Sequence, residues 1–400
     1  MRRSIQGGGH ARRGTSASQR KSKVSTMRMM VETLEPALSQ LRGHAVRIRR
    51  VERDVCNYTS SFQAEHLRLA LEDGSRIPVF FKDLNPEHQI EPAKKVRTID
   101  LGPSYHELHV YREILSQINL GTPQLYAVRW EPDRGIYWLF LEDVGDSRLR
   151  DSRNYERWVP AARWAARFHA ATLRLPKSQL SFLREYDGPH YRACAEKVRA
   201  ILPELEAQDR SLVSRALERY TSLIDWYASL RRTVIHGQFF GKNIMLRSRS
   251  GENMLAVIDW ETAALGPGGY DLVSVSSGRW TREQRQAMWR AYFDQYEAET
   301  RVSRSWEDFC QEIRELELYQ ALEWLAWWRN RSVSHNFGKW VKELGRIIND
   351  NPIAEPEVQP RRAIRWALQA ERLPLVSLIS ALTMGVPGGP ELPQNPPRSM

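Results

Sequence analysis

The chain of 400 residues carries 59 Lys and Arg against 48 Asp and Glu, and 42% of its residues are hydrophobic. This balance is typical of a folded globular protein with two or three domains, and it excludes a chain that is disordered throughout. No run of about 18 apolar residues is present, so we expect no membrane-spanning helix. The three cysteines lie far apart without metal-binding spacing, which favours a cytoplasmic protein with free thiols.

The net charge of +11 is concentrated at the beginning of the chain. Residues 1–50 contain twelve Lys and Arg against Glu32 and Glu35, which gives this segment a net charge of +10. Residues 1–26 have almost nothing to bury, so we predict that they form a disordered basic tail. Such a tail can bind nucleic acid, which is one hypothesis for this protein. A solvated tail is the simpler interpretation, and we expect no nucleic-acid partner.

Residues 31–143 are predicted to form a strand-rich first lobe. Apolar positions alternate along several short segments, and an Asp-Gly turn between two of them is a strong hairpin signal. One longer segment instead shows apolar residues at helical spacing, and Ser104 and Glu107 at its start form a potential capping box. The predicted elements are strands at 44–52, 62–71 and 76–82, a helix at 104–118, and strands at 125–129 and 136–141.

A helix-rich second lobe is predicted over residues 144–375. Two short apolar runs, 233–235 and 255–258, interrupt the helical spacing and flank a polar loop. Residues 386–400 are rich in Pro and Gly and are predicted to form a second disordered tail. A sheet lobe followed by a helical lobe is an α+β architecture in two parts. The predicted helical regions are 154–172, 190–230, 281–298 and 305–329.

The most informative segment lies at residues 234–272. In order it contains His236-Gly237-Gln238, Asn243, Ile258-Asp259-Trp260-Glu261, a Gly-Pro turn and Asp271-Leu272. In order and spacing these residues resemble the catalytic core of the aminoglycoside phosphotransferase and choline kinase-like family. The resemblance extends over about residues 44–345. It implies a bilobal protein kinase-like fold, with a small antiparallel β-sheet lobe and a mainly helical second lobe.

The resemblance also implies an ATP- and Mg²⁺-dependent phosphotransferase that acts on an alcohol hydroxyl of a small molecule. Mg²⁺ takes one or two protein oxygen ligands together with phosphates and water, and Asn243 and Asp259 are the predicted metal ligands and catalytic residues. Lys82 ends a predicted strand where the resemblance places the lysine that holds the phosphates. Its partner would be Glu107, and Glu113 is a second candidate because spacing alone cannot choose between them.

Further nucleotide contacts are expected from two loops of the first lobe. Residues 137–144 resemble the hinge between the lobes, where backbone groups near Glu142 and Val144 would bind adenine. The loop after the first strand has no glycine, and Ser60 and Ser61 would there donate hydrogen bonds to the phosphates. The partners expected for this protein are therefore a nucleotide and a small-molecule acceptor.

Gln238 departs from the family pattern, because it stands where the family has a catalytic aspartate. A neutral amide can orient the acceptor hydroxyl but cannot take its proton, and a general base contributes about 10²–10⁴-fold to the rate. Phosphoryl transfer depends largely on positioning and charge stabilisation, so we predict a phosphotransferase with an altered base position. The alternative is a pseudokinase-like protein that binds a nucleotide or metabolite without transferring phosphate.

The acceptor region is expected in the late helices. Residues 305–323 contain six carboxylates and one basic residue, Arg314, and Trp324, Trp327 and Trp328 follow. An acidic and aromatic wall would suit a cationic acceptor through charge and cation–π contact. A solvated acidic face with core tryptophans explains the same pattern. The acceptor and the oligomeric state therefore stay open at this point.

Overall fold

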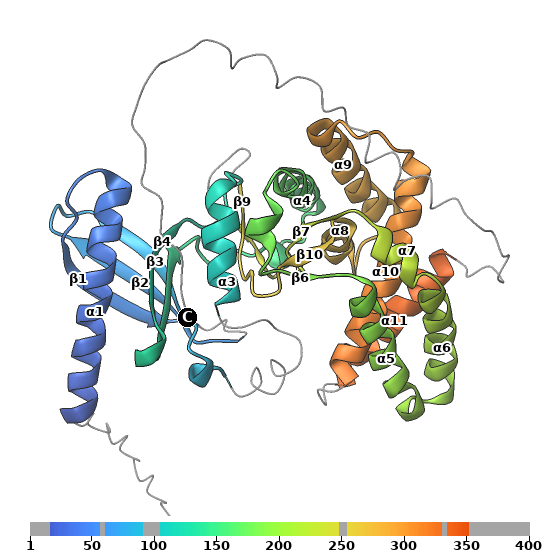
Figure 1. Ribbon diagram of the computed structural model, residues 1–400, viewed down its shortest axis with the longest axis horizontal. Coiled ribbons are helices and arrows are strands. Elements are labelled where there is room, and N and C mark those ends of the chain that lie inside the picture. The colour runs from blue at the N-terminus through green and yellow to red at the C-terminus, as the bar shows by residue number, and fades with distance from the viewer. Residues whose placement is uncertain (1–16, 57–60, 91–104, 248–253, 330–333, 352–400) are drawn as a thin grey trace, which may run out of the picture. The chain divides into compact units, whose positions relative to one another are not determined.

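The computed structural model describes residues 17–56, 61–90, 105–247, 254–329 and 334–351. One helix and an antiparallel sheet come first in the chain, and helices dominate after them (Figure 1). The predicted α+β fold with a sheet lobe and a mainly helical lobe is confirmed. The predicted tail at 386–400 and the end of the second lobe beyond residue 351 lie outside the described residues.

The sheet of the first lobe has five antiparallel strands in the order β1-β2-β3-β5-β4. Strand β3 lies in the middle of the sheet, with Lys82 paired in register to Ala64 on one side and Leu139 on the other. Gly74 turns the chain between β2 and β3 with a φ of +83°, as the Asp-Gly signal predicts. The strands are β1 (Ile48–Val55), β2 (Ala64–Leu71), β3 (Arg76–Asp83), β4 (Leu125–Glu131) and β5 (Ile136–Glu142).

Helix α1 (Ala17–Arg42) precedes the sheet and packs on it (Figure 1). Met30, Leu34 and Leu38 recur every four residues, are buried, and form one hydrophobic cluster with the strands. The prediction of a disordered tail over 1–26 is therefore wrong from Ala17 onward. Once this apolar face nucleates the helix, further residues at its N-terminus join it at little cost.

The predicted helix at 104–118 is divided into three short pieces. Helix α3 (His106–His109) continues into a π-helical turn at Val110–Ile114 and a 3₁₀ turn at Leu115–Gln117. A single π turn of this kind frequently occurs at functional sites. Glu107 and Tyr111 lie four residues apart across the first junction, and both are buried. Ser104, the predicted cap, lies outside the described residues.

The second lobe is built from eight helices within the described ranges, with short strands between them. The single helical region predicted at 190–230 is split after α5, because Pro203 lacks the N–H that a continuous helix needs. The helices are α4 (Val159–Thr172), α5 (Gly188–Ile201), α6 (Ala207–Ser222), α7 (Ile224–Ser229), α8 (Gly269–Ser276), α9 (Arg282–Thr300), α10 (Trp306–Arg329) and α11 (Ser334–Asp350). Over the part of the chain that can be described, none of the helices has the length and apolar character needed to cross a bilayer.

Two small sheets hold the polar loop that the sequence predicts to carry chemistry. Strands β6 (Arg184–Glu185), β10 (Ala264–Pro267) and β7 (Arg232–Ile235) form one sheet in the order β6-β10-β7. Strands β8 (Ile244–Leu246) and β9 (Leu255–Val257) form an antiparallel ribbon. The predicted apolar runs at 233–235 and 255–258 thus appear as β7 and β9, and the loop between β7 and β8 faces the first lobe's central strand.

Candidate active site

Three charged side chains from distant parts of the sequence meet between the sheet and the helical lobe. The ammonium Nζ of Lys82 donates to both carboxylate oxygens of Glu107, at 2.9 and 2.8 Å, and to Oδ1 of Asp259 at 3.0 Å. All three side chains are largely buried, and Glu107 is 2% exposed. Glu113 instead pairs with its exposed neighbour Arg112, so Glu107 is the ion-pair partner of Lys82.

This arrangement keeps Lys82 and Asp259 charged near neutral pH. Burial by itself would lower the pKa of Lys82, but the carboxylates of Glu107 and Asp259 outweigh it and raise that pKa above its usual 10.5. Burial would likewise raise the pKa of Asp259, yet the nearby ammonium groups of Lys82 and Lys242 lower it from 3.8 to about 2. The cluster therefore presents a fixed pattern of charge to the space in front of it.

Asn243 and Asp259 lie at the same end of the β8–β9 ribbon. Ile244 pairs with Val257, so the residue before β8 and the residues after β9 are neighbours, and Ile258 N–H donates to the carbonyl of Asn243 at 2.9 Å. Asp259 has a φ of +69°, a conformation that is uncommon for any residue other than glycine. Such local strain is frequent where the surrounding structure holds a functional side chain in place.

The loop that leads to Asn243 is anchored from below by Asp271, the first-turn carboxylate of α8. Its oxygens accept the backbone N–H groups of His236 at 2.6 Å and Gly237 at 3.0 Å, and Nε2 of His169 lies 3.2 Å away. Gly237 has a φ of +77°, and a Cβ there would lie 2.5 Å from the carbonyl oxygen of Thr262. The turn that presents position 238 thus requires glycine and a buried carboxylate beneath it.

Both ring nitrogens of His236 make contacts with the backbone around the loop. Its Nε2 lies 2.9 Å from the carbonyl of Ile258, and its Nδ1 accepts the backbone N–H of Gln238 at 3.2 Å. This pattern corresponds to a neutral imidazole that donates through Nε2. Burial lowers the pKa of His236 below 6.5 and favours the same state. The imidazole is therefore a structural part of the loop.

Gln238 is held by its backbone and faces a lysine with its side chain. The carbonyl of Gln238 accepts from the amide Nδ2 of Asn243 at 3.0 Å, which leaves the amide oxygen of Asn243 as the atom suited to a cation. The side-chain oxygen of Gln238 lies 3.4 Å from Nζ of Lys242. Sequence analysis missed Lys242, although a basic residue directly before a predicted metal ligand was a usable signal.

The predicted hinge residues lie beside the same space, but one of them has other partners. The N–H of Glu142 donates to the carbonyl of Gln124 at 2.8 Å, and its carboxylate binds the guanidinium of Arg247 at 2.5 and 3.0 Å. None of the residues that the structure describes accepts a hydrogen bond from the N–H of Val144. Val144 is thus the better candidate to meet an adenine ring.

The loop after β1 is described only in part. Ser60 lies outside the described residues, together with positions 57–59. The hydroxyl of Ser61 donates to Oε1 of Glu261 at 2.9 Å, and both residues are buried. The predicted role of Ser61 as a phosphate donor requires this hydroxyl to change partner when a ligand binds.

A cavity of about 340 Å³ lies between these groups, within the usual size range of small-molecule sites. Gln238 is not among the residues that line it. Seven of the predicted residues do: Ser61, Lys82, Glu107, Glu142, Val144, Asn243 and Asp259. Among the described residues there is no cluster of three or more metal-binding side chains. An amide and a carboxylate beside a lysine do fit a Mg²⁺ ion that takes most of its ligands from phosphates and water.

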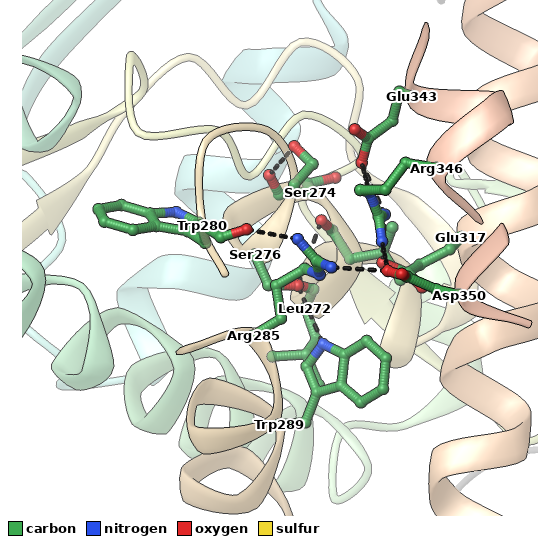
Figure 2. A network of polar contacts seen from close by, with 12 residues as sticks. Leu272, Ser274, Ser276, Trp280, Arg285, Trp289, Glu317, Glu343, Arg346 and Asp350 are labelled. Carbon is green, nitrogen blue, oxygen red and sulfur yellow. Dashed lines mark hydrogen bonds and ion pairs between the residues drawn. The ribbon is translucent and has the colours of Figure 1, made fainter. Parts of the chain in front are cut away.

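The acidic stretch of α10 is largely neutralised inside the fold. Glu312 pairs with Arg304 at 2.5 Å and Glu315 pairs with Arg219, while Glu317 pairs with Arg346 of α11 at 2.9 Å. Figure 2 shows the last of these pairs within a network that joins α9, α10 and α11. Glu315 and Glu317 join α10 to other helices, Glu312 joins it to the segment before it, and the three do not form a wall for a cationic acceptor.

The aromatic part of the same region does lie next to the predicted catalytic loop. The ring of Trp324 is 5.5 Å from that of Phe240 and 5.9 Å from that of Trp340, which it stacks against. Glu323, directly before it, accepts hydrogen bonds from the hydroxyls of Tyr270 at 2.5 Å and Tyr319 at 3.1 Å. Aromatic surface therefore borders the loop, while the adjacent carboxylate is bound by tyrosines.

A sheet lobe and a helical lobe that together place a lysine, a glutamate and an aspartate in one cluster define the kinase-like class of fold. Within this class, residues 89–307, more than half of the chain, match the model of the phosphotransferase enzyme family (APH), and the chain belongs to that family. Among curated protein sequences none matches the chain.

Solved structures of small-molecule kinases share the fold. One is the GDP complex of wild-type aminoglycoside 2'-phosphotransferase-IIIa, with a TM-score of 0.52 at 14% identity, covering 76% of this chain and 94% of the other. Another is an ethanolamine kinase of Plasmodium vivax, with a TM-score of 0.51 at 10% identity, covering 84% of this chain and 95% of the other. At these identities the likeness extends to the fold alone.

Proposed function

We propose that this protein is an ATP- and Mg²⁺-dependent phosphotransferase that acts on a hydroxyl of a small molecule. The observation that carries the proposal is the cluster of Lys82 with Glu107 and Asp259 at a cavity that Asn243 also lines. A paired lysine, a carboxylate and an amide are the groups that phosphoryl transfer needs to hold a phosphate chain and its metal ion.

Each residue has a distinct part in this proposal. Asn243 and Asp259 would hold Mg²⁺, which supplies charge neutralisation to the phosphates when it is bound. Lys82 binds and orients the phosphate chain, and Glu107 holds its ammonium in place. Val144 offers its backbone N–H to the base of the nucleotide. Because electrostatic stabilisation and positioning supply most of the catalysis, these residues can act without a strong general base.

Position 238 decides how fast such an enzyme would be. The amide of Gln238 can orient an acceptor hydroxyl but cannot take its proton, and the ammonium of Lys242 lies 3.4 Å from that amide oxygen. Asp271, the nearest carboxylate to the loop backbone, is 1% exposed and already accepts two backbone N–H groups. The acceptor hydroxyl would therefore lose its proton to solvent or to the phosphate group.

The test compares wild type with Asp259→Ala and Gln238→Asp. ATP binding is measured by thermal shift with Mg²⁺, and ADP release is measured with a panel of amino alcohols, sugars and aminoglycosides. We expect binding in the wild type, loss of Mg²⁺-dependent binding in Asp259→Ala, and faster turnover in Gln238→Asp by 10-fold or more. Asp133→Ala, an exposed turn carboxylate between β4 and β5, is the matched control. No turnover by wild type or Gln238→Asp with any acceptor would contradict the proposal.

A pseudokinase is the second candidate, and the loop itself favours it. The side chain of Gln238 faces a lysine, and the hydroxyl of Ser61 is bound to Glu261. A protein of this kind binds ATP but forms no phosphorylated product in the same assay. Product that disappears in Asp259→Ala would exclude this candidate.

A further inference from the structure

One tyrosine that lines the cavity has a hydroxyl that no residue described by the structure binds. Tyr111 lies one turn after Glu107, in the π-helical segment that follows α3, and is 1% exposed. Its Oη is buried and has no hydrogen-bond partner among the residues that the structure describes. A buried hydroxyl without a partner costs free energy that a phenylalanine at the same position would avoid.

This tyrosine differs from other buried tyrosines without a hydrogen-bond partner because it lies beside charged residues of the cavity. Tyr111 lines the same cavity as Lys82, Glu107 and Asp259. Burial raises the pKa of Tyr111 well above 10, and the carboxylates of Glu107 and Asp259 add to this, so the group keeps its proton and acts as a donor. Lys82 donates to both oxygens of Glu107, and the hydroxyl of Tyr111 makes no hydrogen bond to any of these three neighbours.

A second tyrosine provides the comparison. Tyr191 in α5 is also fully buried and its hydroxyl also has no partner within the described ranges, but it does not line the cavity. Its ring lies among those of Tyr227 at 5.3 Å and Tyr319 at 5.1 Å. The two residues thus share chemistry and burial, and differ in that only Tyr111 lines the cavity.

We propose that Tyr111 is a ligand-binding residue, whose hydroxyl donates a hydrogen bond to an oxygen of the phosphate-bearing ligand in this cavity. This inference rests on the proposed nucleotide site and adds a donor subsite beside the ion pair of Lys82. The accepting oxygen belongs either to the phosphate chain itself or to a water held by its metal ion. Both are strong acceptors, and the hydroxyl has none among the described residues.

The experiment measures the affinity of Tyr111→Phe and Tyr191→Phe for ADP by calorimetry, with and without Mg²⁺, and for adenosine. Hydrogen bonds to charged groups are the stronger class, so we expect Tyr111→Phe to weaken ADP binding about 10-fold and leave adenosine binding unchanged. Loss both with and without Mg²⁺ assigns the acceptor to the phosphate chain, and loss with Mg²⁺ alone assigns it to metal-bound water. Tyr191→Phe is expected to bind all three like wild type.

Thermal unfolding of the ligand-free variants separates ligand binding from a structural role, because loss of a structural contact would lower the melting temperature. Both substitutions remove a hydroxyl without a partner, so the melting temperature should stay the same or rise. Equal ADP affinity in wild type and Tyr111→Phe would overturn the inference, as would an equal loss for adenosine or a marked fall in the ligand-free melting temperature. If wild type itself binds no ADP, the proposed function fails first, which distinguishes the two failures.

Discussion

Glu107→Gln tests the ion pair on which the site depends. Nζ of Lys82 lies 2.8 Å from the carboxylate, and two unit charges at this distance attract each other by about 6 kcal/mol at an effective dielectric of about 20. The substitution also removes the cost of burying the carboxylate, and the amide oxygen still accepts one hydrogen bond from Lys82. About half of the attraction energy therefore remains as a net loss of stability. We expect the free energy of unfolding to fall by about 3 kcal/mol at pH 7.

The measurement is urea unfolding followed by circular dichroism, where the midpoint should fall and the slope should stay constant. Glu113→Gln is the matched control, because this carboxylate lies on the same helical segment and pairs with an exposed Arg112. Exposed pairs contribute about 0–1 kcal/mol, so the control should unfold almost like wild type. Equal effects of the two substitutions would refute the assignment of Glu107 as the buried partner.

Three further predictions concern the loop, the late helices and acid stability. Gly237→Ala should lower stability by about 2–4 kcal/mol, seen as a lower melting temperature in calorimetry, because its Cβ meets Thr262 at a positive φ; an unchanged melting temperature would contradict the close approach. Arg346→Ala leaves the buried carboxylate of Glu317 without its guanidinium and should cost about 2–4 kcal/mol in urea unfolding. Burial alone would raise the pKa of Asp259, but the ammonium of Lys82 outweighs it and lowers this pKa from 3.8 to about 2 in the folded protein. The stability that Asp259 contributes is therefore complete above pH 3.8 and is lost as the pH falls through about 2. Asp259→Asn should flatten the dependence of the free energy of unfolding on pH in this window.

The fold was predictable because its strongest signals are local. The Asp-Gly turn and the alternating strands around it lie where the sequence places them, since side-chain period and turn chemistry act over a few residues. Helix α1 was not predicted at all: the first element expected from the sequence was the strand at 44–52, although Met30, Leu34 and Leu38 recur at helical spacing. The division of the helix after Glu107 was also missed, since a π turn leaves no mark in the spacing of apolar residues.

In the candidate site, too, the residues of the motif could be predicted, whereas contacts between distant parts of the chain could not. The resemblance to the family indicated Lys82, Asn243 and Asp259, because it rests on residue types in a fixed order and spacing. It could not choose between Glu107 and Glu113, a choice that depends on which side chain faces the sheet. Nor could it indicate that the carboxylates of α10 are paired with arginines from three other segments, because ion pairs between distant positions have no local pattern.

Two hydrogen bonds between side chains join the two lobes across the cavity: Ser61 donates to Glu261, and Lys82 donates to Asp259. A movement that separates the two lobes would break these contacts, and each would release a buried polar group that needs a new partner. Exchange of a bound molecule is therefore coupled to the loss of two contacts made by residues that line its own cavity. The residence time of a ligand in this protein would thus be set partly by the buried contact of Ser61 with Glu261, as well as by the direct contacts to the ligand.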